Sequence, residues 1–377
     1  MITITVNDGA ASAIDAEDLS TLGGKTAGVA TVSSAVNISG TQTQLTAALV
    51  TESTKVVATS ANVILDNGSN FTIAQFDDIN SAVGGTIAYT ISDTAANITT
   101  SNNSAASKIN NATALTVVDD GETTGSTLNL NNATTTNLTS ATITGDGGAD
   151  VVQLSSALTS SNIVTMDFVS DASADKLIFN LTDSSDYITY DASGNVITGS
   201  GRPTAFTFNK FSNFDLASGE DQFGIFYDEE GGSGAINAAG PFLEISITTP
   251  SPAYRLRDGI VYEDSFNSEG DILSSTALNA SAIRANIGSF INTGGTASAS
   301  GTGSDDLDFT YVLYARSSST EDANSVQSAY IYSGTYSGQN QGTNAFDASK
   351  LSIIGLAEIV GVTEGDLQDA FVTTNPF

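Results

Sequence analysis

Short runs in which apolar and polar residues alternate recur through residues 1–145 of the chain. This alternation, in runs rich in β-branched residues, predicts half-buried β-strands. The runs begin at Gly28, Lys55, Thr86 and Ala114. Between them, apolar residues spaced three or four positions apart predict short helices at 16–22, 41–49 and 74–83. The pattern therefore predicts a mainly β protein whose N-terminal half carries short helices.

An internal repeat supports this assignment. The segment from Ile14 through Gly23-Gly24 aligns with the segment from Ile73 through Gly84-Gly85, so that Gly84 corresponds to Gly23. Each copy reads as a helix, a Gly-Gly stop and a strand, and we expect the glycines to provide a positive φ where the helix ends. Because one such unit cannot bury its own apolar face, repeated units stack. The repeat predicts an elongated, solenoid-like module, with chance similarity in Thr- and Ala-rich sequence as the alternative.

The composition changes near residue 181. An alternating Asn- and Thr-rich run at 126–144 continues the strand pattern, and aromatic residues become frequent from 187 to 227. A Gly-, Ser- and Thr-rich stretch at 293–304 reads as a loop or link, and strong strands are predicted at 307–315, 329–332 and 350–356. We therefore expect three regions: a repeat module at 1–145, a turn region with a β domain at 146–292, and a C-terminal β domain at 293–377. The latter two are expected to be β-sandwich-like, and the last ends in a tail for secretion or assembly.

Composition narrows the chemistry that the chain can perform. There are 42 Asp and Glu residues against 11 Lys and Arg, a formal net charge of −31, and there is no His, Cys or Trp. Without His and Cys, a Ser–His–Asp triad, an H-E-x-x-H zinc site and thiolate chemistry are excluded. A carboxylate pair for glycoside cleavage stays open. The densest acidic clusters, at 228–230 and 305–308, are explained more simply as solvated loops. We expect no enzymatic activity.

The same charge restricts partners and location. Such an acidic chain repels nucleic acid. No run of about 18 apolar residues is present, so we expect no membrane insertion. The N-terminal residues carry no Sec-type signal pattern. A chain without such a signal could be cytoplasmic, could be built into a virion, or could leave the cell by a C-terminally read secretion route. We expect an extracellular or cell-surface location, with a place in a virion as the alternative.

One Gly-rich turn has the composition of a calcium-binding loop. The segment beginning at Gly145 places Gly148, Asp150 and apolar Val152 as in the nonapeptide G-G-x-G-x-D-x-U-x, with Asp146 in place of the second glycine. Glycines let such a turn expose its carbonyl groups, and the aspartate adds a carboxylate. Calcium prefers six to eight oxygen ligands of this kind. The turn therefore predicts a calcium site, with an ordinary turn carrying solvated aspartates as the alternative.

A weaker copy of this pattern follows later in the chain, at 170–178. It places two aspartates in the corresponding positions. The predicted metal ligands are Asp146, Gly148, Asp150, Asp171 and Asp175.

Residues 145–179 resemble the degenerate repeats of RTX-type, type I secreted proteins, in which the repeat is followed by a strand of the form x-D-F-x-x-x-x-D-x-L-x-F. Residues 346–371 are similar to the C-terminal region of the same proteins. The Thr- and Ala-rich N-terminal half is similar to repeats of bacterial surface-layer-like proteins. The resemblance implies secretion, calcium binding and a place at the cell surface.

These observations favour a non-enzymatic structural protein that self-assembles outside a cell, as a surface-layer or filament subunit with calcium bridging its acidic sites. Its expected partners are its own copies, divalent cations and surface polysaccharide. A virion appendage, capsid-decoration or fibre protein is one alternative. A polysaccharide-binding or polysaccharide-cleaving β-solenoid is another.

Overall fold

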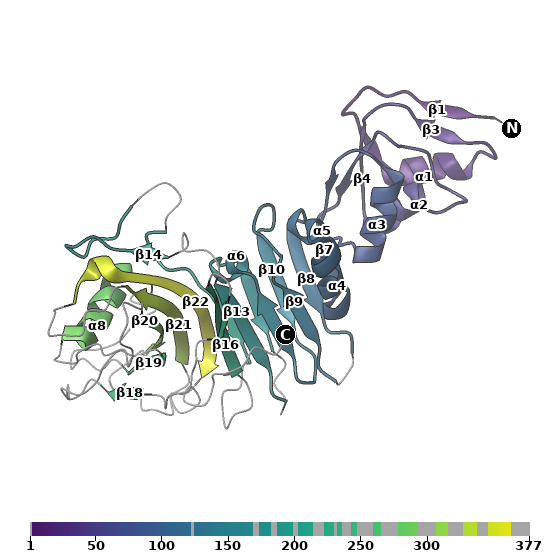
Figure 1. The fold of residues 1–377 in the computed structure, drawn as a ribbon. Helices are drawn as coiled ribbons and strands as arrows, with labels where there is room; N and C mark the ends of the chain where they lie inside the picture. The colour runs from purple at the N-terminus through teal and green to yellow at the C-terminus, as the bar shows by residue number, and fades with distance from the viewer. Residues whose placement is uncertain are drawn as a thin grey trace. The chain divides into compact units, whose positions relative to one another are not determined.

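The protein is described by a computed structural model, shown in Figure 1. The described residues are 2–121, 124–168, 173–181, 187–198, 203–213, 222–229, 232–235, 243–246, 259–264, 278–292, 307–315, 327–337 and 346–362. Within them the chain is a mixed α/β protein in which most elements are strands in sheets and few are helices. Two compact units are present. The first contains 1–118 and 134–142, and the second contains 119–133 and 143–377.

The first unit alternates short strands with short helices. Its strands are β1 (Ile4–Val6), β2 (Ala13–Asp15), β3 (Ala30–Val32), β4 (Asn37–Gly40), β5 (Asn62–Leu65), β6 (Ile87–Ala88), β7 (Ile91–Thr94), β8 (Ala114–Val118) and the start of β10 (Ser140–Thr144). Its helices are α1 (Ala16–Gly24), α2 (Gln42–Leu49), α3 (Ile73–Ala82), α4 (Ala95–Ala105) and α5 (Ser107–Asn110). The helices predicted at 16–22, 41–49 and 74–83 are therefore confirmed, as is the strand beginning at Ala114.

Strands of the first unit lie parallel, with a nearly constant offset along the chain. In the sheet β2–β4–β5–β6, Ile14 pairs with Ile38, Ile38 with Val63, and Val63 with Ile87. Strand β1 pairs with β3 in the same way, with Ile4 beside Ala30. Each pass of the chain therefore places its strand directly beside the strand of the preceding pass.

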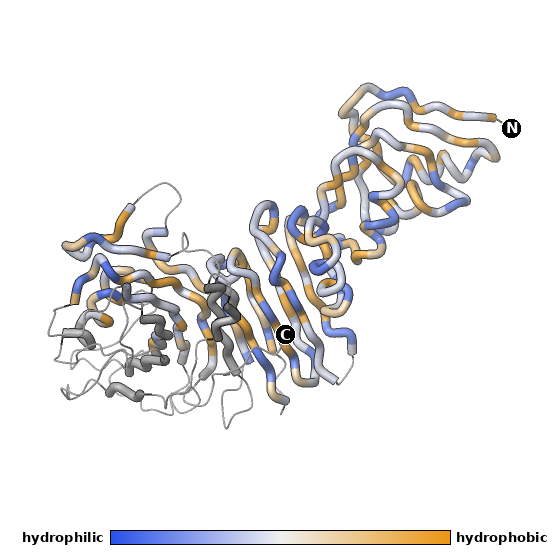
Figure 2. Tube along the Cα trace, in the orientation of Figure 1, coloured by the Kyte–Doolittle hydropathy of each residue, from blue (hydrophilic) through white to orange (hydrophobic). Residues whose placement is uncertain are grey.

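Side chains that point inward along these strands form the core of the first unit. Ile38 and Val63 are fully buried, whereas the neighbouring Ile64 is 43% exposed. Strand β10 repeats the alternation of exposed and buried positions along its length. Figure 2 colours the chain by hydropathy, and hydrophobic and hydrophilic stretches alternate along it. The period-two pattern of the sequence thus reflects strands with one buried and one outer face.

The helices begin at defined capping residues. In α2, Thr41 and Gln44 form a capping box, and in α3 the same arrangement is made by Thr72 and Gln75. Each box satisfies two backbone N–H groups that have no partner inside the helix. Helix α1 contacts α2, α2 contacts α3, and α3 contacts α4, so the helices of successive passes lie side by side.

The predicted repeat, which aligned Gly23 with Gly84, was wrong in its spacing. The strands that follow its two glycine pairs, β3 and β6, lie in different sheets. The predicted role of the glycines was also wrong, because Gly23, Gly24, Gly84 and Gly85 are not among the residues with positive φ. Three of them instead permit close backbone approach. A Cβ atom at Gly23 would overlap the Thr54 carbonyl, and one at Gly84 would lie 2.7 Å from the Thr59 oxygen.

The second unit begins with parallel strands of similar offset. Its strands β9 (Thr127–Leu130), β11 (Val151–Leu154), β13 (Lys176–Leu181) and β16 (Gln222–Glu229) form one sheet, closed by antiparallel β17 (Gly232–Ala235). Leu128 pairs with Val152 and Val152 with Leu177. The next pairing, of Leu177 with Phe223, spans a longer segment of chain. The remaining elements of this part are α6 (Ser156–Thr159), β12 (Val164–Asp167), β14 (Ile188–Thr189) and β15 (Asn209–Ser212).

The C-terminal part of the second unit is a sheet packed around an aromatic core. The strands run in the order β18 (Leu243–Ser246), β19 (Gly259–Asp264), β20 (Leu307–Ala315), β21 (Gln327–Tyr336) and β22 (Leu351–Val362). Helix α8 (Ala280–Asn292) and the 3-10 turn η3 (Ala348–Lys350) complete it. Ile283 and Ile287 of α8 pack with buried Tyr311, Tyr332 and Phe206. The aromatic residues described here belong to a β core, and the predicted strands at 307–315, 329–332 and 350–356 are confirmed. The loop predicted at 293–304 lies outside the described residues.

The second unit contains residues 119–133 as well as 143–377. It places the predicted regions 146–292 and 293–377 together in one unit. Within the described part of the chain, no helix is long and apolar enough to cross a membrane.

Candidate functional site

The Gly-rich turn of the second unit brings four of the five predicted ligands together, three aspartates and Gly148. Asp146, Asp150 and Asp175 are 3%, 1% and 3% exposed. The backbone N–H of Asp150 donates to Asp175 Oδ1 at 2.8 Å, and that of Asp146 donates to Asp150 Oδ2 at 3.0 Å. Gly148 donates its N–H to Asp146 Oδ1 at 3.2 Å. Asp171, the fifth predicted ligand, lies outside the described residues.

These carboxylates link successive passes of the chain. Asp150 Oδ1 accepts hydrogen bonds from the backbone N–H of Ser126 at 2.8 Å and from the Ser126 hydroxyl at 3.2 Å. Ser126 lies 24 residues before Asp150, and Asp175 lies 25 residues after it. Asp150 and Asp175 each therefore fix a turn of the pass before them, because their oxygens accept backbone N–H groups that would otherwise be buried without a partner.

The aspartates predicted as calcium ligands of this turn accept hydrogen bonds from the protein backbone. Calcium needs six to eight oxygens directed at one point. Here four carboxylate oxygens accept backbone N–H groups. Among the residues that the structure describes, no group of three or more acidic side chains is arranged to hold a metal ion. As described, the turn is held by hydrogen bonds within the protein.

The electrostatics of the turn are set by burial. Desolvation raises the pKa of Asp150 from 3.8 to about 6, and the neighbouring Asp146 carboxylate adds to this effect. The backbone N–H groups of Ser126 and Asp146 lower the pKa, but by less. Burial disfavours the charged form of a carboxyl group, so the folded state binds a proton here more tightly than the unfolded chain does.

We expect the contribution of Asp150 to the stability of the second unit to increase as the pH falls from about 7 to about 4. Above pH 6 the buried carboxylate is charged in both states, and its desolvation disfavours the folded one. Between the folded pKa of about 6 and the unfolded value of 3.8, only the folded state gains the proton, so the free energy of unfolding rises. Thermal unfolding at a series of pH values, followed by circular dichroism, measures the slope.

The matched variant for this prediction is Asp150→Asn, which cannot titrate. Relief of charge repulsion elsewhere in the chain remains in the variant, so only the difference between the two slopes reports on Asp150. Equal slopes for the wild type and the variant would contradict the assignment, whatever the absolute stability of the variant.

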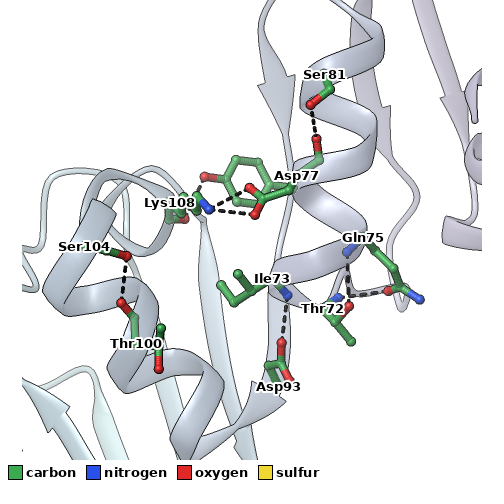
Figure 3. Close-up of polar contacts among 10 residues, drawn as sticks. Thr72, Ile73, Gln75, Asp77, Ser81, Asp93, Thr100, Ser104 and Lys108 are labelled. Atoms are coloured by element: carbon green, nitrogen blue, oxygen red, sulfur yellow. Dashed lines mark hydrogen bonds and ion pairs between the residues drawn. The ribbon is translucent and has the colours of Figure 1, made fainter.

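A second buried carboxylate, in the first unit, was missed by the sequence analysis. Asp93 is 6% exposed and lies where β7 leads into α4. Its Oδ2 accepts the backbone N–H of Ile73, the first residue of α3, at 2.8 Å (Figure 3). Its Oδ1 accepts the Thr94 N–H at 2.9 Å and the Asn97 side-chain amide at 2.8 Å. A signal was present in the sequence, because Asp and Thr are favoured residues at helix N-termini and Thr94 is the N-cap of α4.

The same region contains an ion pair between α3 and α5. Lys108 Nζ lies 2.7 Å from the Asp77 carboxylate, as Figure 3 shows. The backbone carbonyl of Lys108 accepts the Tyr89 hydroxyl at 2.7 Å. Burial raises the pKa of Tyr89 to about 12, so this hydroxyl stays protonated and donates. These contacts hold neighbouring passes together.

Asparagine side chains form a similar connection beside β4 and β5. Asn62 Nδ2 donates to Asn37 Oδ1 at 2.9 Å, and the Thr86 N–H donates to Asn62 Oδ1 at 2.9 Å. The spacing of the three residues along the chain matches the strand register, in which Asn37 pairs with Asn62. Polar side chains of both units thus serve the same purpose of joining one pass to the next.

The two acidic clusters noted in the sequence lie only partly within the described residues. Asp228 and Glu229 end β16, whereas Glu230 and the acidic residues 305–306 lie outside the described part. A shallow cleft of about 290 Å³ in the second unit is lined by residues 196, 204–205 and 278–281. This lining contains no acidic residue, so it offers no carboxylate pair for glycoside cleavage.

No model of a known protein family, no curated protein and no solved structure matches the chain.

Proposed function

We propose that the chain is a non-enzymatic structural protein that self-assembles on the outside of a cell, as a surface-layer or filament subunit. One observation carries this proposal, namely the parallel register that repeats at a nearly constant interval in the first unit and at the start of the second. On this proposal the passes form a parallel β-solenoid, a fold that presents extended repeated surfaces to partners.

The use of the polar side chains supports a structural role. Asp93, Asp150 and Asp175 are buried and accept backbone N–H groups from neighbouring passes. A catalytic carboxylate must instead reach a substrate with free oxygen atoms. The buried carboxyl groups of these turns are better explained as connections within a rigid scaffold.

Calcium enters the proposal as a bridge between copies. At a net charge of −31, copies of the chain repel one another unless cations screen or bridge their carboxylates. Among the described residues, ion pairs join Lys55 to Glu52 and Lys108 to Asp77. The exposed carboxylates of Asp8 and Asp78 take part in neither pair. Exposed carboxylates on two copies can share a calcium ion with its water ligands.

The proposal is tested by assembly in the presence and absence of calcium. We expect purified protein to form large ordered assemblies at about 1 mM calcium, within the affinity range of extracellular calcium modules. A chelator should disperse them, as followed by sedimentation and electron microscopy. Sodium chloride at equal ionic strength is the control, because it screens charge without bridging. Assembly that ignores chelation would contradict the calcium bridge, and failure to assemble in every condition would contradict the structural role.

A further inference from the structure

Strand β1 of the first unit has an open edge and incompletely buried apolar side chains. Ile4 and Val6 pair in register with Ala30 and Val32 of β3, which are 1% and 3% exposed. Ile4 and Val6 themselves are only half-buried, and the adjacent Ile2 is 76% exposed. Paired residues of the two strands therefore differ in burial, and the side chains of β1 are the more exposed.

The cause of this difference is the chain segment at Val57, which forms a parallel β-bridge with β3 on the side away from β1. Val57 pairs with Thr31, donates its N–H to the Ala30 carbonyl and accepts the Val32 N–H, each at 2.8 Å. Strand β3 therefore has a neighbour on both sides. Strand β1 pairs only with β3 among the described residues, as Figure 1 shows for this unit. What covers β3 is an extended backbone segment that exchanges N–H···O bonds with it, so a second extended backbone would complete β1 in the same way.

The hydrogen-bonding groups on the open edge can be assigned by alternation. The Ile4 N–H donates to the Val29 carbonyl, and the Val6 carbonyl accepts the Ser33 N–H, so both residues bond toward β3. Successive residues of a strand direct their backbone groups to opposite sides. The N–H and C=O groups of Thr3, Thr5 and Asn7 therefore point to the open edge.

We propose that β1 pairs antiparallel with β1 of a second copy of the chain, across a two-fold axis at Thr5. This inference deepens the proposed self-assembly and rests on it. With Thr5 opposite its own symmetry mate, the two residues exchange both N–H···O bonds, and Thr3 pairs with Asn7 of the other copy. Ile4 then lies opposite Val6 of the other copy, on the face where both are half-buried.

Charge favours contact between two copies through β1 rather than through the edge of β2. Strand β1 and the residues before it, 2–6, carry no charged side chain, whereas β2 ends at Asp15, directly before Glu17 and Asp18. Two copies that each carry −31 can approach most closely through an uncharged segment. The contact is small, so we expect a weak dimer with a dissociation constant on the order of 1–100 μM. A two-fold contact closes on itself, so larger assemblies need a second contact elsewhere.

The absence of cysteine from the chain provides a direct test. In the variant Thr5→Cys the only two thiols of the dimer are opposite each other, at a Cα separation of about 5.5 Å that a disulfide spans. Mild oxidation should give a covalent dimer of twice 38.4 kDa. The matched control is Thr43→Cys, an exposed threonine on α2, which should cross-link at least about tenfold more slowly, a difference of about 1.4 kcal/mol.

A second pair of variants keeps the test independent of oxidation. Thr5→Pro removes the outward N–H and should give a monomer in sedimentation equilibrium, whereas Thr5→Val keeps this group and should remain a dimer. A wild type that is monomeric at about 100 μM in a calcium-free buffer would overturn the inference. Equal cross-linking of the two cysteine variants would also overturn it, even if calcium still drives larger assembly. Conversely, a dimer that never assembles further would contradict only the proposed function.

Discussion

Replacing Asp93 with alanine is expected to lower the free energy of unfolding of the first unit by about 3–5 kcal/mol. The carboxylate is 6% exposed and accepts hydrogen bonds from the Ile73 N–H, the Thr94 N–H and the Asn97 amide. Alanine would leave these donors buried without a partner. It would also remove a negative charge from the N-terminal ends of α3 and α4, where the helix dipoles favour it.

Urea unfolding followed by circular dichroism measures this loss. The matched control is Asp78→Ala, an exposed aspartate on α3 that should change stability by less than about 0.5 kcal/mol. Asp93→Asn should be intermediate. Its oxygen can still accept the Thr94 N–H, but its amide group would face the Ile73 N–H. A loss below about 1 kcal/mol for the alanine variant would show that Asp93 does not hold the two helices.

The second large effect is expected at the end of α1, where two adjacent glycines should respond in opposite directions. A Cβ atom at Gly23 would lie 2.6 Å from the Thr54 carbonyl carbon and overlap its oxygen, so Gly23→Ala must move one backbone segment away from another. Such overpacking costs about 1–3 kcal/mol. At Gly24 the nearest atom is the Thr54 methyl at 3.4 Å, an ordinary contact. Gly24→Ala should therefore stabilise the helix by about 0.5–1 kcal/mol.

The two glycine variants are controls for each other, because they make the same chemical change in the same turn of one helix. Thermal unfolding of both, side by side with the wild type, gives the sign directly. If both variants were stabilised, the close approach of α1 to the Thr54 carbonyl would be contradicted.

The elements that the sequence analysis predicted correctly are those with strong apolar periodicity. Helices α1 to α3 place Leu19, Leu45 and Ile79 toward the core at helical spacing, and all three are buried. Helix α4 was missed because its sequence, rich in Asn, Ser and Thr, has low helix propensity. It is stabilised by tertiary contacts, namely the fully buried Ile98 and the Asp93 carboxylate at its start.

The register was missed for a different reason. The sequence analysis aligned the glycine pair at Gly23 with the one at Gly84, but the stacking of the chain depends on polar side chains that join one pass to the next. Asn37 and Asn62 are 25 residues apart, as are Asp150 and Asp175. That spacing was visible in the sequence, but the sequence analysis considered the two aspartates only as calcium ligands. Whether their oxygens meet a cation or a backbone N–H depends on the turn facing them, which no local pattern specifies.

The nearly constant offset between paired strands also sets which changes of length the chain can tolerate. A residue gained or lost between Ile38 and Val63 would turn every later side chain of that strand to the opposite face, or would have to be absorbed in a turn. Removal or duplication of one whole pass, such as the segment from Ile38 to the residue before Val63, preserves the facing of every strand on both sides. Relatives of this chain should therefore differ in length by multiples of one pass, and engineered versions can be shortened or extended in the same steps.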